Sequence, residues 1–304
     1  MSSEPKEEWN DERSAIRRVS AGIVRQTLGP DSAARVGDVL EDGGRLASYL
    51  GNARGRESAQ RLLEMRNRHW GQRAWIIGNG PSLRDMDLSP LANEFTFGSN
   101  RVYLAFDDLG FHTTYLSGSA RWIIRQFGEE MAQSGPQVFL SHLFASEVPT
   151  LPRTVTTFLS RRRASFGTHP LFWGFHDGGT VTYTSMQLAF YMGFTEVILI
   201  GVDHSFVETG TAAAEVVPQA DDDPRAATVV SGGDDPNHFL PNYFGKGVKW
   251  SLPSWHQMEE SYAMARKRYE AAGRLIVDAT VGGKLTIFPK VDYEKVVSSR
   301  VVRP

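Results

Sequence analysis

Two kinds of apolar spacing divide the chain. Over residues 15–28 and 36–50, apolar side chains fall three to four positions apart, which is the period of an amphipathic helix. A third helix is expected over residues 57–69. Farther along the chain, short apolar runs alternate with such helical segments. This change of pattern predicts an N-terminal helical region, residues 1–70, followed by an α/β domain, residues 71–304.

The alternation after residue 70 predicts a mostly parallel, Rossmann-like sheet with helices on both faces. A long amphipathic helix is expected over residues 255–272, with Met258, Tyr262, Ala265 and Tyr269 on its buried face. The fold class is therefore α/β with an N-terminal helical appendage. The apolar runs expected to form strands cover residues 74–77, 95–97, 113–116, 138–140, 196–202 and 275–277.

The first of these strands stops at a glycine-rich turn, in which Gly78, Asn79, Gly80 and Pro81 lead to Ser82. Glycines allow unusual dihedrals and a close approach to a bound group, and proline and serine favour a turn and a helix cap. Unpaired amides at such a turn form a natural anion site. The turn lacks the Gly-Lys-Ser/Thr ending of a P-loop and the full G-x-G-x-x-G fingerprint. A nucleotide site is predicted here, and a purely structural tight turn is the alternative.

A second glycine loop has a similar setting. Gly178, Gly179, Thr180 and Val181 precede a helix, and the strand that follows the helix ends in Asp203. Ligands of open α/β sheets bind outside the carboxyl ends of the strands. We therefore expect these residues to converge on one crevice, together with the glycine turn that begins at Gly78 and with Asn100. In this crevice Asp203 would bind a ribose hydroxyl or a metal; the alternative is a cap or turn carboxylate.

Two later segments look like functional loops. Residues 207–233 are poor in large apolar groups, so we expect a mobile loop that orders when nucleotide binds, or a disordered one. The run of aspartates at 221–223 favours solvation over metal binding. Residues 235–247 concentrate polar, aromatic and special-backbone residues without apolar periodicity, which is typical of a functional loop. The alternative is a turn that ties down buried side chains.

Composition narrows the class of protein. The 304 residues carry a net charge of −2, which argues against a nucleic-acid partner bound through a global positive field. With no cysteine there are no disulfides or thiolate metal sites. The chain has no run of about 18 apolar residues and no signal-peptide core at its start. We expect a cytoplasmic protein without a transmembrane segment; peripheral work beside a membrane and a homo-oligomer are both compatible with the sequence.

Several motifs resemble a known group of enzymes. They are I-I-G-N-G-P-S-L, G-G-T-V, G-F-T-E-V-I-L-I-G-V-D, D-P-N-H-F and A-T-V-G-G-K-L, which together span about residues 73–290. They resemble the domain shared by archaeal 6-hydroxymethylpterin diphosphokinases and bacterial motility accessory factor-type glycosyltransferases. The chain is also similar to bacterial sialyltransferases of the Campylobacter type, which share the G-N-G-P-S-L opening and the strand that ends in glycine, an aliphatic residue and aspartate.

The sialyltransferase resemblance assigns roles. It implies that Asn79 and Asn100 hold the nucleotide, that the backbone of 179–181 meets the phosphate and that Asp203 binds the ribose or base. It places His238 at the position of the catalytic histidine. The enzymes of that group have tyrosines soon after the strand-end aspartate, and these tyrosines stabilise the leaving phosphate. This chain has His204, Ser205 and Phe206 there instead. That role would pass to Tyr243, to Lys246 or to the arginines at 161–163.

The leading hypothesis is a glycosyltransferase that uses a nucleotide-activated sugar, such as a CMP-linked acidic sugar. It would modify a glycan or other sugar acceptor, as in polysaccharide biosynthesis. His238 would be the general base, Tyr243 and His204 further catalytic candidates, and no metal or other cofactor would be required. For His238 the alternative is a loop histidine bonded to backbone.

Two other functions stay open. One is an ATP-dependent, 6-hydroxymethylpterin diphosphokinase-like enzyme, in which Asp203 with Asp177 or Asp235 would hold Mg²⁺. The other is a non-catalytic nucleotide-binding scaffold that docks partners through the N-terminal helices.

Overall fold

The computed structural model describes residues 42–161, 164–171, 174–205, 215–217 and 228–299, and residues 49–304 form one compact unit. The predicted helix over residues 15–28 and the first part of that over 36–50 lie outside the described residues, and residues 42–51 are helical. Within the described ranges, no helix is long and apolar enough to cross a membrane.

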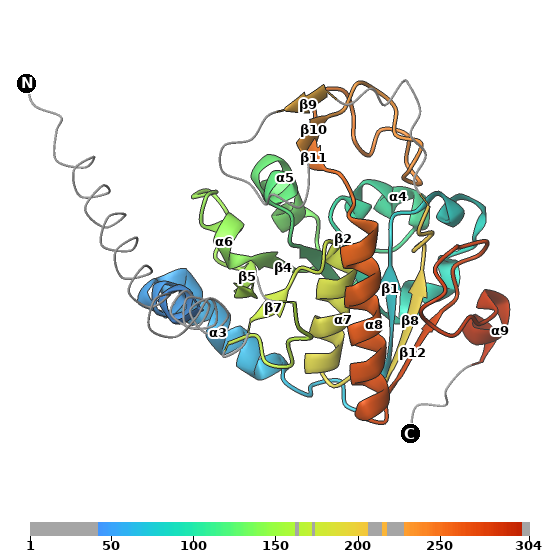
Figure 1. The fold of residues 1–304 in the computed structure, drawn as a ribbon, viewed down its shortest axis with the longest axis horizontal. Helices are drawn as coiled ribbons and strands as arrows, with labels where there is room; N and C mark the ends of the chain where they lie inside the picture. The colour runs from blue at the N-terminus through green and yellow to red at the C-terminus, as the bar shows by residue number, and fades with distance from the viewer. Residues whose placement is uncertain (1–41, 162–163, 172–173, 206–214, 218–227, 300–304) are drawn as a thin grey trace, which may run out of the picture. The chain divides into compact units, whose positions relative to one another are not determined.

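A seven-stranded parallel sheet forms the centre of this unit, with the strand order β12-β8-β1-β2-β3-β4-β5 (Figure 1). The α/β fold class expected from the sequence is thereby confirmed. The strands are β1 (Arg73–Ile77), β2 (Phe95–Ser99), β3 (Tyr115–Gly118), β4 (Gln137–Ser141), β5 (Thr156–Phe158), β8 (Glu196–Ile200) and β12 (Leu275–Asp278).

Helices cover both faces of the sheet. Along β1, Trp75 and Ile77 pack on one face with side chains from α5, and Ala74 and Ile76 are buried on the other. A strand buried on both faces needs a continuous apolar run, which is why the sequence marks β1 so clearly. The helices are α3 (Ala53–Met65), α4 (Phe106–Leu109), α5 (Arg121–Gln133), α6 (His142–Ala145), α7 (Val181–Tyr191), α8 (Trp255–Ala271) and α9 (Tyr293–Ser298), with the short 3₁₀ turns η1 (Pro81–Asp85), η2 (Ser89–Asn93) and η3 (Val102–Ala105).

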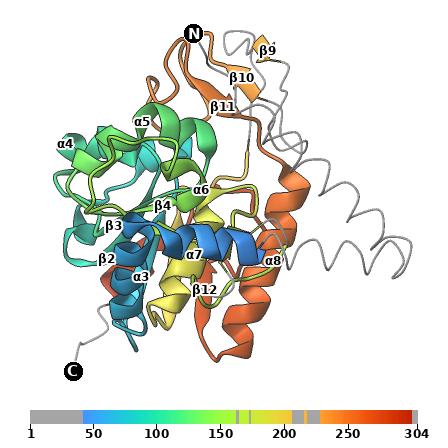
Figure 2. The same cartoon turned by 90° about the vertical axis from the view of Figure 1, so that its left-hand side faces the viewer.

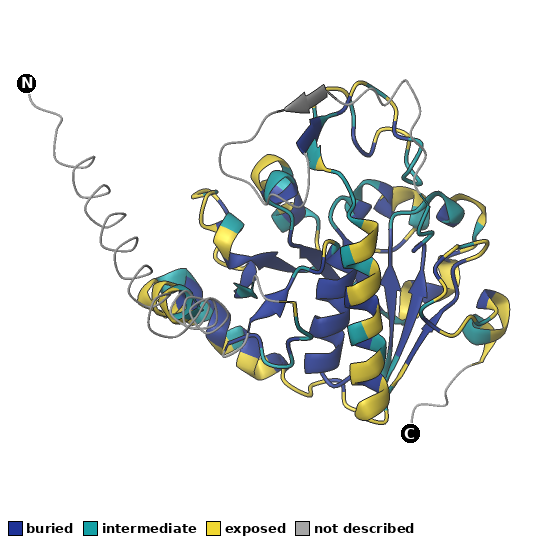
Figure 3. Cartoon of the chain, in the orientation of Figure 1, coloured by how far each residue is buried: buried dark blue, intermediate teal, exposed yellow. Residues whose placement is uncertain are grey.

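Helix α7 lies between the sheet and α8, and its environment explains its composition. All eleven of its residues are buried, so it is not amphipathic, whereas α8 covers it and exposes its outer side (Figure 3). Tyr262, Ala265 and Tyr269 of α8 are fully buried, as the sequence predicts. Met258 lines a cavity instead. A helix that is buried all round requires such a central position, and its polar side chains Ser185 and Gln187 are hydrogen-bonded within the protein.

Helix α3 begins four residues earlier than expected because Asn52 caps it, its Oδ1 accepting a hydrogen bond from Gly55 N at 2.8 Å. It packs beside the edge strand β5 (Figure 1) and lies in front of the large sheet in Figure 2. Ser58 Oγ accepts a hydrogen bond from Thr157 N at 3.0 Å, and Arg61 Nε donates to Thr156 Oγ1 at 3.0 Å. This side of the sheet is therefore covered by a helix from the region that precedes the first strand.

A small antiparallel sheet stands above the carboxyl edge of the large one and corrects part of the sequence analysis (Figure 1). It consists of β9 (Glu215–Val217), β10 (Thr228–Val230) and β11 (Lys249–Ser251). The segment 207–233 was expected to be one long loop, but two of its short valine pairs form strands. β-Branched residues have a high propensity for strands. Residues 207–214 and 218–227 lie outside the described residues, so the expected ordering of this segment on nucleotide binding stays a prediction.

Two short strands, β6 (Ser160–Arg161) and β7 (Phe175–His176), pair in parallel beside the large sheet and lead into the glycine loop before α7. Their partner is the side chain of Gln187 in α7. Its Oε1 accepts a hydrogen bond from His176 N at 3.2 Å, and its Nε2 donates to His176 O at 2.7 Å. These buried contacts fix the start of the loop relative to the helix that follows it.

Candidate functional site

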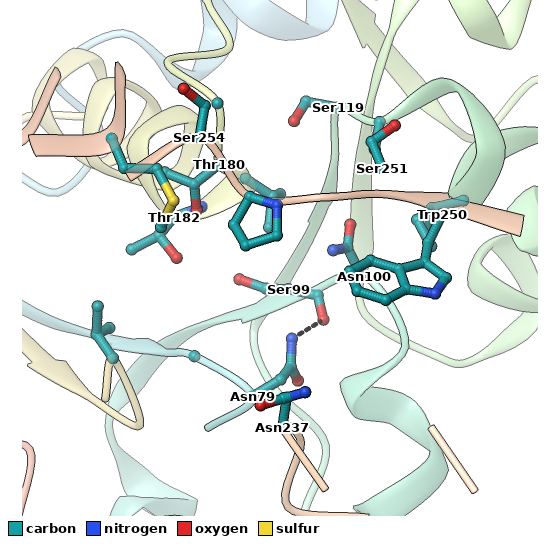
Figure 4. Close-up of a pocket in the computed structure, with 18 of the residues that line it drawn as sticks. Asn79, Ser99, Asn100, Ser119, Thr180, Thr182, Asn237, Trp250, Ser251 and Ser254 are labelled. Carbon is teal, nitrogen blue, oxygen red and sulfur yellow. Dashed lines mark hydrogen bonds between the residues drawn. The ribbon is translucent and has the colours of Figure 1, made fainter. Parts of the chain in front are cut away.

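The chain reverses its direction of winding beside β1, and a cavity opens there. After β1 the strands are added in one direction as far as β5, and β8 then returns to the other side of β1. In open α/β sheets such a switch point leaves a crevice at the carboxyl ends of the strands. A cavity of about 360 Å³ lies at this place, which is within the usual range for small-molecule sites (Figure 4).

The cavity gathers most of the residues that the sequence nominates. The predicted residues on its wall are Gly78, Asn79, Gly80, Asn100, Gly179, Thr180, Val181, Asp203, His204 and His238. Ser82, Gly178 and Tyr243 are close in sequence to these residues but do not line the cavity. Segments from the ends of β1, β2 and β8 and from the start of α7 thus meet at one edge of the sheet.

The glycines of the first turn serve contact between two chain segments. Gly78 N donates to Ile200 O at 2.8 Å, and Gly80 N donates to Gly201 O at 2.9 Å. A Cβ atom on Gly78 would lie 2.1 Å from Gly201 O, so no side chain fits there. Neither Gly78 nor Gly80 has a positive φ, so the expected unusual dihedrals are absent at both. The close approach that requires glycine here is to the strand end of β8.

Asp203 joins the same two segments. Its Oδ1 accepts from Ser82 N at 3.1 Å, and its Oδ2 accepts from Ser82 Oγ at 2.9 Å. Burial raises the pKa of this carboxyl, and the hydrogen bonds from Ser82 oppose that effect. Asp203 therefore fixes the turn after β1 while one side of it faces the cavity. Its predicted contact with a ribose or base stays a prediction, as does the nucleotide contact of Ser82.

Buried polar atoms without a protein partner face this part of the cavity. Asn79 Nδ2 donates to Ser99 O at 3.1 Å, which fixes the amide so that Oδ1 is left as an acceptor (Figure 4). Asn79 Oδ1 and Ser99 Oγ are both buried and make no hydrogen bond to the described residues. Next to them, Asn100 adopts a left-handed φ of 50°. Unpaired buried polar atoms cost free energy, and unusual backbone conformations cluster at binding sites.

The second glycine loop ends at the N-terminus of α7. Gly178 and Gly179 have φ values of 63° and 74°, and the Thr180 side chain caps the helix by accepting from Thr182 N at 3.3 Å. A Cβ on Gly178 would lie 2.4 Å from the Tyr183 ring, so this glycine is required by packing. Gly179, Thr180 and Val181 face the cavity. The N-terminus of an eleven-residue helix is a favourable environment for an anion.

His238 lines the cavity and is held in a fixed orientation. Its Nδ1 lies 2.6 Å from Asp235 Oδ2, and its ring stacks flat on Tyr243 with centroids 4.1 Å apart. The His238 side chain is 22% exposed and Asp235 only 7%. Arg84 holds the backbone at this point by donating to His238 O at 2.7 Å. The imidazole therefore has one nitrogen on a buried carboxylate, and Nε2 has no hydrogen bond among the described residues.

The contact of Asp235 with His238 was not expected from the sequence, which suggested Asp235 only as a metal ligand. Asp235 also accepts a hydrogen bond from Asn237 N at 3.0 Å, so the loop itself orients the carboxylate. The spacing D-x-x-H is too common in loops to mark such a pair. Only the stacking of the ring on Tyr243 and the hydrogen bond from Arg84 bring the two side chains together.

The other candidates for the leaving-group role lie away from the cavity. Tyr243 is fully buried, and its hydroxyl accepts from Arg101 N at 3.3 Å. Burial raises its pKa above the ordinary value, so the phenol stays neutral behind His238. Lys246 is exposed and Arg161 does not line the cavity. The arginines at 162–163 lie outside the described residues.

His204 occupies the wall between α7 and α8. Its Nε2 lies 2.9 Å from Glu259 Oε1, and its ring meets Trp255 edge to face with centroids 4.7 Å apart. The backbone at His204 is left-handed, with φ of 52°. Its Nδ1 is buried and has no hydrogen-bond partner among the described residues.

Two further segments that the sequence did not nominate complete the lining. Trp122 starts α5 and donates from Nε1 to Thr228 Oγ1 at 2.9 Å, which connects the small sheet to the helix. Trp250 stacks on Phe244 with centroids 5.1 Å apart. Both tryptophans face the cavity, as does Trp255. No periodicity marks them, because they come from a short strand and two helix starts that are far apart in sequence.

Carboxylates near the cavity are already engaged. Asp203 binds Ser82, Asp235 holds His238, and Asp177 Oδ1 accepts from Gly179 N at 3.2 Å. Within the described part of the chain, no group of three or more His, Cys, Asp or Glu side chains is placed to hold a metal ion.

Comparisons with known proteins give distant structural likenesses. No protein family and no curated protein matches the sequence. The fold is similar to a MAf glycosyltransferase from Magnetospirillum magneticum AMB-1, at 14% identity and a TM-score of 0.43, over 78% of this chain and 38% of that one. It is also similar to the sialyltransferase CstII from Campylobacter jejuni in complex with a substrate analogue, cytidine-5'-monophosphate. That match has 15% identity and a TM-score of 0.40, over 73% of this chain and 85% of that one. The chain spans about two fifths of the length of the first structure. At such values the function has to be argued from the cavity itself.

Proposed function

We propose that this protein is a glycosyltransferase that binds a nucleotide-activated sugar in the cavity beside β1. The observation that carries the proposal is the pair of Asp235 and His238, 2.6 Å apart, on a cavity at the switch point of the sheet. A histidine oriented by a buried carboxylate is suited to proton transfer near neutral pH. A site built only to bind a ligand has no need of such a pair.

His238 would act on the acceptor. Because Nδ1 faces Asp235, the ring proton is held there and Nε2 is left with a lone pair. As the bond between the acceptor oxygen and the anomeric carbon forms, the hydroxyl proton passes to Nε2. The bond from the anomeric carbon to the phosphate oxygen breaks, and its electron pair leaves with the phosphate. Asp235 stabilises the positive charge that develops on the ring.

The phosphate would lie at the start of α7, where Gly179, Thr180 and Val181 face the cavity. The nucleoside would lie toward Asn79 and Ser99, whose unpaired acceptors match the hydroxyls of ribose or the amine of cytosine. Two features support a CMP-linked acidic sugar as the donor: the sialyltransferase resemblance and a positively charged side chain on the cavity wall. Arg121 lines the cavity at the start of α5, where it also pairs with Glu147 at 3.2 Å.

The diphosphokinase alternative asks for carboxylates that share a metal ion. Here Asp203 binds Ser82, Asp235 binds His238 and Asp177 binds Gly179 N, and no group of three or more possible ligands gathers among the described residues to hold Mg²⁺. The donor set of the described residues therefore does not fit this metal. For the proposed glycosyl transfer, the acceptor is a hydroxyl group of a sugar in a glycan.

A thermal-shift panel tests the binding half of this proposal. Purified protein is heated with CMP, CDP, UDP, GDP or ATP, each with and without Mg²⁺. A ligand at 100 times its Kd stabilises the native state by about 2.7 kcal/mol, which a melting curve resolves. We expect a cytidine nucleotide to give the largest shift, independent of Mg²⁺.

The control for the panel is a pair of asparagine variants. Asn79→Ala removes the unpaired acceptor in the cavity and should abolish most of the shift, whereas Asn242→Ala alters an exposed asparagine and should retain it. If no nucleotide stabilises the wild-type protein, the proposal is wrong. A shift seen only with ATP and Mg²⁺ would support the diphosphokinase instead.

A further inference from the structure

The cavity contains a second histidine–carboxylate pair that the proposed acceptor chemistry does not use. His204 Nε2 lies 2.9 Å from Glu259 Oε1, and the His204 side chain is 10% exposed. Its other nitrogen, Nδ1, is buried without a hydrogen-bond partner in the described structure. The ring belongs to the wall of the cavity, so a molecule bound there lies next to His204.

The pair of His204 and Glu259 is connected to the N-terminus of α7 through the first turns of α8. Tyr262, three positions after Glu259 on α8, is fully buried, and Thr180 and Thr182 at the start of α7 lower the pKa of its hydroxyl against the larger, raising effect of burial. On the preceding turn of α8, Gln257 lies against Gly179, where a Cβ would approach its Oε1 to 3.2 Å. The first turns of α8 therefore pack against the helix start that faces the cavity. His204 contacts the same turns, through Glu259.

The backbone at His204 also indicates a functional constraint. His204 has a φ of 52°, and a positive φ is uncommon for residues other than glycine and is maintained when the surroundings determine it. Trp255 packs on the edge of the ring, and Glu259 holds Nε2. These contacts leave Nδ1 as the only polar atom of the ring that lacks a partner. Burying that atom is unfavourable unless a ligand completes its hydrogen bonding.

We propose that His204 is a catalytic residue that binds the phosphate group of the nucleotide, with Glu259 as its positioning residue. This inference rests on the proposed function and names a second contact at the same site. When both ring nitrogens carry protons, Nε2 donates to Glu259 and Nδ1 donates to a phosphate oxygen. The positive ring and the α7 amides then stabilise the charge that collects on the leaving phosphate. His204 thus serves the donor, while His238 serves the acceptor.

The test compares a nucleotide with its nucleoside, because the two differ only in phosphate. Kd values for CMP and cytidine are measured by isothermal titration calorimetry at pH 6.5 with wild-type protein, His204→Asn and Glu259→Gln. Asparagine is chosen because it tolerates a positive φ better than most residues. His204→Asn should weaken CMP binding roughly 10- to 100-fold, the worth of a charged hydrogen bond. Cytidine binding should change less than twofold in both variants.

The matched control is on the same helix. His256 and Glu260 of α8 form a pair at 3.4 Å, but both are exposed and neither lines the cavity. His256→Gln and Glu260→Gln should leave both Kd values unchanged. Glu259→Gln keeps a hydrogen-bonding group beside His204 but removes its charge, so CMP binding should fall about 3- to 10-fold.

The outcomes separate this inference from the proposed function. If wild-type protein binds CMP and His204→Asn binds it equally well, the role of His204 is wrong and the glycosyltransferase proposal stands. If CMP and cytidine affinities fall together, His204 shapes the pocket rather than binding phosphate, and the inference is also wrong. If wild-type protein binds neither CMP nor UDP or GDP, the proposed function and the inference are both overturned.

Discussion

His238 shows how little of the proposed catalytic geometry is local in sequence. Asp235 is three positions away, but the flat stacking on Tyr243 and the hydrogen bond from Arg84 to His238 O define where the ring points. The sequence predicted this histidine from its loop composition and from the family resemblance. It did not predict the supporting contacts, because Arg84 is more than 150 positions away and a buried tyrosine in a loop has no periodic signature.

At the scale of single residues, the carboxylate of Asp235 is expected to affect the rate of sugar transfer through its contact with His238. Asp235→Asn retains the shape of the side chain but removes the charge that orients and stabilises the ring of His238. Sugar transfer should fall roughly 10- to 10³-fold, while the Kd for nucleotide stays within twofold. Steady-state kinetics and calorimetry on the same sample check both quantities.

Asp234→Asn is the neighbouring control, since Asp234 is exposed whereas Asp235 is buried. It should behave as the wild-type protein does. Equal activity of the two variants would show that His238 works without its carboxylate, or does not work as a base.

The turn between β1 and η1 illustrates what the sequence can and cannot say about an element. The glycines were correctly expected to permit a close approach, but the group approached is the chain itself, since a Cβ on Gly78 would overlap Gly201 O at 2.1 Å. Strand β8, which lies beside β1, begins about 120 residues after Gly78. The sequence around Gly78 therefore does not indicate this contact. The sequence likewise did not indicate that the carboxylate of Asp203 accepts a hydrogen bond from Ser82 in this turn.

Gly78→Ala should therefore destabilise the protein. The overlap is with backbone, which cannot move aside as a flexible side chain can, so the free energy of unfolding should fall by about 1–3 kcal/mol or more. Denaturant unfolding followed by circular dichroism measures the change. Nucleotide binding should weaken with it, because the turn carries Asn79.

Gly245→Ala is the control for this substitution. A Cβ at Gly245 meets its nearest atom, Asn242 O, at 3.9 Å, and its φ is not positive. Its effect should stay within about 0.5 kcal/mol. If Gly78→Ala is equally mild, the turn has more freedom than its contacts imply.

For the whole molecule, the order of the strands decides where the site lies. Six strands of the large sheet were predictable because buried parallel strands need continuous apolar runs, as in β1 and β8. The seventh, β5, was missed because two of its three residues are threonines. The crevice beside β1 followed from the general behaviour of doubly wound sheets. The small sheet was missed because β9 to β11 are only three residues each, and so was the tryptophan wall that Trp122 and Trp250 contribute. Such parts of a site are assembled only by the packing of remote segments.

The most direct test of the central claim is a transfer assay on His238→Ala with a CMP-linked acidic sugar and a glycan acceptor, with product sugar and released CMP quantified by mass spectrometry. Loss of the base should lower turnover by roughly 10² to 10⁴-fold, while the Kd for CMP changes less than twofold. Phe239, the next residue, contributes its backbone to the Asn79 contact and is no proton acceptor, so Phe239→Leu should transfer sugar at close to the wild-type rate. Near-wild-type transfer by His238→Ala between pH 6 and 8 would contradict the assignment of His238 as the base.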